Sequence, residues 1–149
     1  MSFSSSAKED LAKIRLKSDS VRLAQLAGLV HTCGALTLGR GRGAAFSTET
    51  LAVGKLIVSL ADALYSLETT IELSQRERRH PLTLVTLLGD DAEKLLLDTG
   101  LLTLESGEFS IGETVPARLL SDDESRRAFL RGAFLGSGSC TNPYRGYHL

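Results

Sequence analysis

A weak internal repeat constrains the fold of this chain more than any other feature of its sequence. Residues 22–34 align with residues 126–138 at an offset of 104 positions, and five of the thirteen aligned residues are identical. The identical pairs are Arg22/Arg126, Ala24/Ala128, Leu26/Leu130, Gly28/Gly132 and Gly34/Gly138. In each copy the alanine and the first glycine are four residues apart, so they share one helix face, where small side chains let two backbones approach closely. Two ordinary amphipathic helices with incidental glycines remain an alternative interpretation of the repeat alone.

Hydrophobic periodicity and turn residues predict the order of elements along the chain. The predicted helices cover roughly residues 6–16, 20–33, 51–64, 90–97, 115–120 and 121–135. The predicted strands cover residues 35–38, 44–48, 69–73, 82–88, 101–104 and 109–111. Capping boxes at Ser6, Asp90 and Ser121 begin three of the helices, and left-handed glycines at Gly34 and Gly100 end two of them. The order predicts an α+β fold in which helices cover one face of an antiparallel sheet.

Composition and charge exclude several classes of protein. The 149 residues carry 17 basic and 18 acidic side chains, for a net charge of −1. This balance rules out a basic coat over the whole surface but leaves room for a local basic patch. No apolar run in the sequence is long enough to cross a membrane, and we expect no signal peptide, because the first residues lack a basic stretch followed by an apolar one. Its two cysteines, Cys33 and Cys140, are too few for a disulfide framework. We therefore expect a cytoplasmic protein with reduced thiols.

The first copy of the repeat resembles a known family. Leu26-Ala-Gly-Leu-Val-His-Thr-Cys-Gly34 is similar to the signature helix of LAGLIDADG homing endonucleases, and residues 130–138 resemble a more degenerate second copy. The chain also resembles a narrower group, the WhiA-type regulators of sporulation and cell division in Gram-positive bacteria. The segments that carry this second resemblance are residues 2–5, 22–38, 93–102, 126–139, 142–143 and 146–149.

The resemblance implies a fold and a domain organisation. Each repeat of the LAGLIDADG fold has the order αββαββα, and the two signature helices pack together at a pseudo-two-fold axis. We expect an N-terminal helix over residues 1–19, a first repeat over 20–120, and the second signature helix with the start of a truncated second repeat over 121–149. WhiA-type proteins also have a C-terminal helix-turn-helix region that binds promoters. The chain would then be a piece of the N-terminal region that lacks this C-terminal region.

The resemblance also identifies the positions at which nuclease chemistry would reside. Homing endonucleases place one metal-binding carboxylate before the terminal glycine of each signature helix, and the equivalent positions here are Cys33 and Ser137. Neither side chain supplies the hard anionic oxygen that Mg²⁺ prefers. We therefore expect no metal, no cofactor and no enzymatic activity. His31 and Cys33 could suggest a softer metal site, but two ligands are too few to support one.

Five arginines in two loops are candidates for DNA contact. Arg40 and Arg42 belong to the first predicted hairpin tip, and Arg76, Arg78 and Arg79 belong to the second. In the LAGLIDADG fold such loops border a saddle-shaped sheet that covers DNA, and arginines there can bind phosphates. The near-neutral net charge favours solvated loops instead. The sequence thus leaves two function classes open: a regulator module that contacts double-stranded DNA, or a scaffold for self-association or for binding other regulators. An active nuclease ranks last.

Overall fold

The computed structural model describes residues 3–38, 42–74 and 81–140. Its helices are α1 (Phe3–Ala12), α2 (Asp19–Cys33), α3 (Leu51–Leu64), α4 (Ala92–Thr99) and α5 (Asp123–Ser137), with a 3₁₀ turn, η1 (Ala117–Leu120). Its strands are β1 (Gly34–Thr37), β2 (Gly43–Thr48), β3 (Glu68–Ser74), β4 (Leu82–Leu88), β5 (Leu102–Glu105) and β6 (Glu108–Ile111). This order of elements confirms the predicted α+β fold with an αββαββα unit.

The first four strands form one antiparallel sheet in the order β1-β2-β4-β3, and β5 and β6 form a separate hairpin. Strand alternation divides the side chains of the sheet between two faces. Phe46 of β2 pairs with Val85 of β4, and both side chains are buried on the face that the helices cover. Ala45 and Thr86 pair on the opposite face, which we call the outer face. The sheet therefore has one covered face and one outer face.

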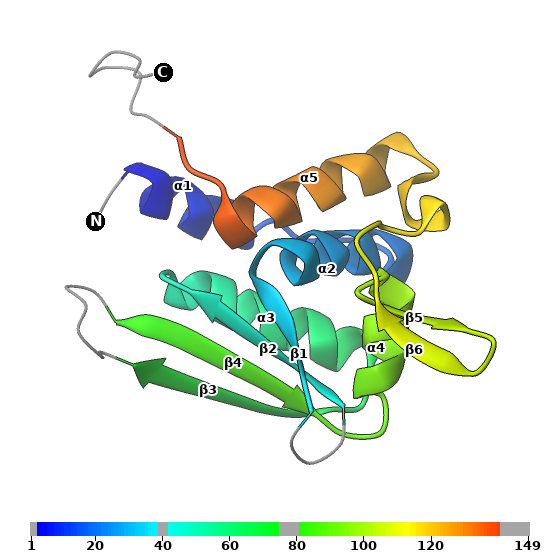
Figure 1. Cartoon of the computed structure of the whole chain (residues 1–149). Coiled ribbons are helices and arrows are strands. Elements are labelled where there is room, and N and C mark those ends of the chain that lie inside the picture. The colour runs from blue at the N-terminus through cyan, green and yellow to red at the C-terminus, as the bar shows by residue number, and fades with distance from the viewer. Residues whose placement is uncertain (1–2, 39–41, 75–80, 141–149) are drawn as a thin grey trace.

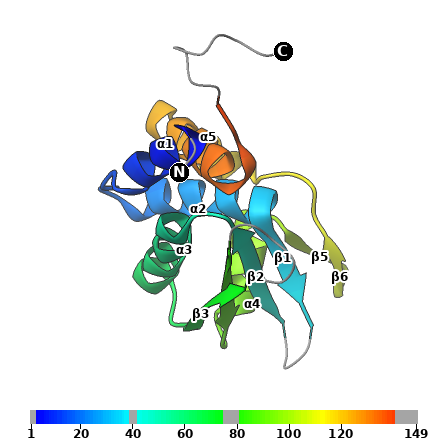
Figure 2. The ribbon, with the colours of Figure 1, turned by 90° about the vertical axis from the view of Figure 1, so that its left-hand side faces the viewer.

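The helices form two layers over the covered face of the sheet (Figure 1). α2, α3 and α4 lie next to the strands, and α5 with α1 lies above α2 (Figures 1 and 2). The central position of α2 explains its burial, since Leu26 and Leu29 are both 0% exposed. These two leucines join Phe46, Ile57 and Val85 in the main hydrophobic core. No helix in the described ranges is long and apolar enough to cross a membrane.

Three of the predicted helix starts are wrong by one to three residues. α1 begins at Phe3 rather than Ser6 and ends at Ala12. α4 begins at Ala92 after Asp91, which makes no side-chain capping bond, so the predicted cap at Asp90 is not formed. The N-cap of α5 is Asp122, whose carboxylate accepts the backbone N–H of Ser125, and not the neighbouring Ser121. In each case several polar residues compete for the cap, and sequence spacing does not decide between them.

The two glycines predicted to end helices behave differently. Gly100 closes α4 in the left-handed conformation, with φ of +84°, as expected. Gly34 instead has an extended backbone with φ of −95° and is the first residue of β1, so the left-handed cap predicted there is wrong. Gly34 is needed for space, because a Cβ at this position would lie 2.7 Å from the carbonyl oxygen of Val30.

Candidate functional site

The two signature helices, α2 and α5, pack backbone against backbone. A Cβ added to Gly28 would lie within 3.0 Å of the carbonyl oxygen of Phe129, and one added to Gly132 would lie as close to that of Gln25. At the offset of 104, Gly28 corresponds to Gly132 and Gln25 corresponds to Phe129, so the two contacts are symmetry mates of each other. The predicted packing residues Ala24 and Ala128 are also fully buried, in a cluster with Val21.

The same pseudo-symmetry continues into the N-terminal turns of both helices. Ser18 caps α2 by accepting the N–H of Val21, and Asp122 caps α5 by accepting that of Ser125. In each helix an arginine then binds the first-turn aspartate and a carbonyl oxygen six residues earlier. Arg22 donates to Asp19 and, at 2.9 Å, to the Leu16 carbonyl. Arg126 donates to Asp123 and, also at 2.9 Å, to the Leu120 carbonyl.

Sequence reasoning missed this N-terminal part of the repeat. Leu16/Leu120 and Asp19/Asp123 are identical pairs at the same offset of 104, so the signal was present in the sequence. It was hidden because the two cap residues, Ser18 and Asp122, differ in type although they make the same bond. The arginine beside Asp123 also holds the pKa of that carboxyl below its ordinary value, through their hydrogen bond and opposite charges.

The C-terminal ends of the helices meet near Cys33 and Ser137, the two positions at which the resemblance places the metal-binding acids of homing endonucleases. A Cβ added to Gly136 of α5 would lie 3.5 Å from the Cys33 sulfur of α2. Burial raises the pKa of the Cys33 thiol to about 11, against a small opposing effect of Lys8, so the sulfur is a neutral S–H at physiological pH. Gly34 and Gly138 cap the two helices directly after Cys33 and Ser137. This junction therefore presents a thiol and a hydroxyl, neither of which is charged.

A hollow of about 410 Å³ adjoins the end of α5, and its lining includes Lys8, Ser137 and a single carboxylate, Glu49. No group of three His, Cys, Asp or Glu side chains that could hold a metal ion exists within the described residues. His31 is engaged elsewhere, because its Nε2 lies 2.6 Å from the carbonyl oxygen of Thr99. The hollow therefore provides one carboxylate, that of Glu49, whereas metal-dependent hydrolysis with two carboxylates would need a second one.

Only one of the five candidate DNA-binding arginines lies within the described residues. The guanidinium of Arg42 donates to Glu93 at 2.9 Å and stacks over the ring of Phe109, with 3.8 Å between its Cζ and the ring centroid. These contacts hold Arg42 against α4 and the β5–β6 hairpin. Arg40, Arg76, Arg78 and Arg79 lie outside the described residues.

The sheet itself carries no positive charge. β1, β2, β3 and β4 contain no Lys or Arg, and Glu68 and Glu72 of β3 face the outer side. The described residues from 42 to 117 contain three basic and eleven acidic side chains. The described residues before and after them, 3–38 and 118–140, contain nine basic and six acidic side chains. Among the described residues, charge thus divides between a basic helical layer, residues 3–38 and 118–140, which also include β1, and an acidic body, residues 42–117, which contains β2, β3 and β4.

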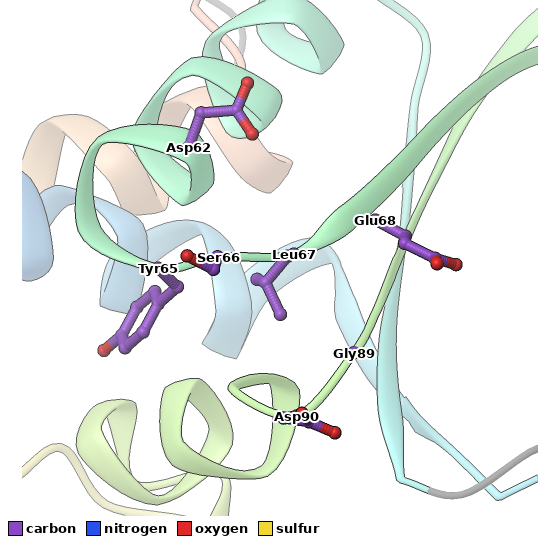
Figure 3. A pocket seen from close by; sticks show the side chains of 7 residues that line it. All are labelled: Asp62, Tyr65, Ser66, Leu67, Glu68, Gly89 and Asp90. Atoms are coloured by element: carbon purple, nitrogen blue, oxygen red, sulfur yellow. The ribbon is translucent and has the colours of Figure 1, made fainter.

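The acidic body includes a hollow of about 610 Å³ at the start of β3, which we call the acidic hollow (Figure 3). The carboxylates of Asp62, Glu68 and Asp90 belong to its lining, which contains no basic residue. Tyr65 also lines it and donates its hydroxyl hydrogen bond to Asp98 at 2.7 Å. Burial, followed by this hydrogen bond and the charge of Asp98, raises the pKa of the Tyr65 hydroxyl.

Comparison with known proteins identifies the relatives of this fold. The family profile described as "WhiA LAGLIDADG-like domain" matches residues 126–149. Two proteins named "Probable cell division protein WhiA" match the whole chain, at 32% identity in Thermoanaerobacter sp. (strain X514) and 35% in Alkaliphilus oremlandii (strain OhILAs). In both cases the chain covers 48% of the relative, so it spans about half the length of the curated relatives that it matches.

Two solved structures share the fold. The structure titled "Crystal structure of full-length DUF199/WhiA from Thermatoga maritima" matches 96% of this chain and 42% of its own, with a TM-score of 0.67 and 22% identity. The structure titled "Crystal structure of the N-terminal LAGLIDADG domain of DUF199/WhiA" matches 98% of this chain and 63% of its own, with a TM-score of 0.64 and 21% identity. The resemblance expected from the signature helices is therefore confirmed: the whole chain is similar to about half the length of proteins named WhiA, and it shares the fold of the N-terminal LAGLIDADG domain of DUF199/WhiA.

Proposed function

We propose that this chain is a non-catalytic LAGLIDADG-like module of a bacterial regulator of cell division and transcription. The junction of the signature helices carries this proposal, because Cys33 and Ser137 stand where two metal-binding carboxylates would be required. Burial raises the pKa of Cys33, so its thiol is neutral in the metal-free chain, and sulfur is in any case a soft ligand that Mg²⁺ does not prefer. The relatives named as cell division proteins support the regulatory role. A cytoplasmic location, with both cysteines reduced, belongs to the same proposal.

Incubation of the chain with supercoiled plasmid and Mg²⁺ or Mn²⁺ tests the loss of nuclease activity. We expect the plasmid to stay intact over hours at any metal concentration. Cleavage that co-purifies with the wild-type chain and disappears in Cys33→Ala or Ser137→Ala would contradict the proposal. Cys140→Ala is the matched control, since Cys140 is an exposed thiol that follows the C-terminal end of α5.

Within this role, the charge distribution favours a protein-interaction scaffold over a DNA saddle. Phosphate binding needs exposed Lys and Arg, and the described strands of the sheet have none. Arg42 is also committed to Glu93 and Phe109. DNA contact would thus depend on the loop arginines at positions 40, 76, 78 and 79, and it stays a prediction of the sequence.

Titration of the chain against random-sequence duplex at two salt concentrations separates these roles. A scaffold binds the duplex weakly or not at all, and charge reversal at Arg40 and Arg42 leaves that result unchanged. Tight binding that falls steeply with salt and is lost in Arg40→Glu/Arg42→Glu would instead establish a DNA saddle.

A further inference from the structure

The edge strand β3 has few of the features that commonly protect a sheet edge. It pairs on one side with β4, through seven continuous residue pairs from Glu68–Leu88 to Ser74–Leu82, and the register has no bulge. Its sequence, Glu-Thr-Thr-Ile-Glu-Leu-Ser, has no proline and no lysine. Charged side chains (above all lysine), proline and bulges are the usual means by which natural proteins block pairing at an edge, and the charges that β3 carries are both negative, Glu68 and Glu72. No described strand pairs with the other side of β3, which therefore offers a template for one further strand of opposite charge.

In the part of the chain that the structure describes, the helix side of this edge is apolar and uncovered. Ile71 is paired with the buried Val85, and Leu73 with the buried Thr83, so both side chains point to the face on which α3 packs. A Cβ added to Gly54 of α3 would meet the side chains of Thr83 and Val85, which places α3 over β4. Beyond this helix Ile71 remains 38% exposed and Leu73 61% exposed. An added strand with apolar side chains at the facing positions would cover both residues.

The outer side of the same edge is acidic. Glu68 and Glu72 alternate with Ile71 and Leu73 and pair with Leu88 and Leu84 of β4. The acidic hollow, with Asp62 and Asp90, extends the negative charge beyond Glu68 (Figure 3). Neither β3, β4 nor the lining of the hollow contains a basic residue that would neutralise it. The complementary strand is therefore basic at the positions that face Glu68 and Glu72.

We propose that the free edge of β3 binds an extended segment of a partner protein in which basic and apolar side chains alternate. The segment adds a fifth strand to the sheet, covers Ile71 and Leu73 with its apolar side chains, and pairs its basic side chains with Glu68 and Glu72. This inference rests on the scaffold role proposed above and names the surface and the chemistry of the partner.

An NMR titration of the isotope-labelled 149-residue chain tests the proposal with a designed peptide. In an antiparallel alignment with β3, the peptide Thr-Val-Lys-Ile-Thr-Val-Lys places its lysines opposite Glu72 and Glu68. We expect saturable shifts of the amide signals of residues 68–74, and a loss of binding when both lysines are replaced by glutamate. Equal affinity for the two peptides, or shifts confined to other elements, would overturn the proposal.

Charge reversal in the protein provides the matched control. We expect Glu68→Lys/Glu72→Lys to weaken binding of the basic peptide about tenfold, because two attractive cross-strand pairs become repulsive. Glu105→Lys/Glu108→Lys makes the same charge change on the β5–β6 hairpin and should leave the affinity unchanged. Leu73→Thr, an exposed change that preserves β-propensity, should weaken binding about threefold and provides a second readout if the double variant does not fold.

Two further outcomes keep this proposal distinct from the scaffold role. The first outcome is self-association of the chain through β3, detected as a concentration-dependent dimer that Glu68→Lys/Glu72→Lys abolishes. It would show that a second copy of the chain occupies the edge, and it would overturn the proposal that a partner protein binds there. Binding of the peptide at another surface would also overturn this site while leaving the scaffold role intact. The scaffold role itself fails only in the separate DNA titration.

Discussion

Leu26 of α2 and Leu130 of α5 occupy equivalent positions of the internal repeat, yet Leu26 is fully buried and Leu130 keeps 65% of its surface exposed. The helices share caps, arginine contacts and a reciprocal glycine contact. They differ in what lies on the side away from their common interface, because α2 rests on the sheet and the outward face of α5 has no such layer among the described residues (Figure 1). A repeated sequence pattern thus predicts pairing between helices, while burial of the remaining face depends on tertiary context.

Truncation of the two leucines tests this difference most directly. Leu26→Ala leaves a cavity in the main core, and we expect a loss of about 4 kcal/mol in the free energy of unfolding. Leu130→Ala removes an exposed side chain, so its effect should stay within about 0.5 kcal/mol. Urea denaturation followed by circular dichroism measures both values. Similar losses for the two variants would show that an additional layer covers Leu130 in solution.

Alanine substitution of Gly28 and Gly132 tests the close backbone contact between α2 and α5. Gly28→Ala and Gly132→Ala each introduce a methyl group against a backbone carbonyl of the other helix, and backbone can yield only by moving the helices apart. We expect each change to cost about 2 kcal/mol, after the gain in helix propensity of about 1 kcal/mol is subtracted. The two losses should agree closely in the same denaturation assay. A large difference between them would contradict a pseudo-symmetric contact.

Removal of the N-cap side chains of α2 and α5 tests a further feature that the two helices share, and we expect a smaller loss in the free energy of unfolding. Asp122 accepts the Ser125 N–H at 2.8 Å, whereas Ser18 accepts the Val21 N–H at a longer 3.3 Å. We expect Asp122→Ala to cost about 1.5 kcal/mol and Ser18→Ala about 0.5 kcal/mol. Thermal unfolding of Asp122→Asn and Ser18→Thr controls, which retain a capping oxygen, should show smaller losses. The reverse ranking of the two alanine variants would mean that cap geometry does not control these ends.

The remaining prediction depends on pH and concerns the thiol at the end of α2. The pKa of Cys33 rises from 9.0 to about 11 on folding, so the unfolded chain ionises this thiol at lower pH than the folded chain. Its contribution to stability is complete below pH 9 and is lost as the pH rises towards 11. Denaturation midpoints of the wild type and Cys33→Ala should therefore converge between these values, while Tyr65 titrates equally in both. A constant difference would show that the thiol is not protonated preferentially in the folded state.

Much of the fold could be predicted from the sequence because its periodic segments are long and bounded by clear turn residues. α3 and β4 have the predicted bounds of 51–64 and 82–88. The helix starts failed where Ser and Asp residues are adjacent, as at Ser121 and Asp122, since several local hydrogen bonds have similar energies there. The left-handed cap predicted at Gly34 was wrong for another reason, because the neighbouring strand and the core determine the conformation of this residue.

The candidate site was predictable only in part. The repeat identified the glycines and alanines of the helix pair, and their contact follows from small side chains alone. The segregation of charge was missed, because a net charge of −1 conceals it and because only the fold brings the basic residues of 3–38 and 118–140 together in one layer. The internal contacts of Arg42 were equally hidden, because this side chain meets Glu93 and Phe109 only after distant segments fold together. The division of the chain near residues 19 and 120 stays a prediction.

The guanidinium of Arg42 has a mechanical consequence. It joins the start of β2 to Glu93 in the first turn of α4 and to Phe109 in the hairpin strand β6. Three segments that are distant in sequence therefore meet at one side chain, which connects the sheet to the β5–β6 hairpin. Loss of this one side chain, as in Arg42→Ala, should therefore weaken the packing of both α4 and the β5–β6 hairpin against the sheet.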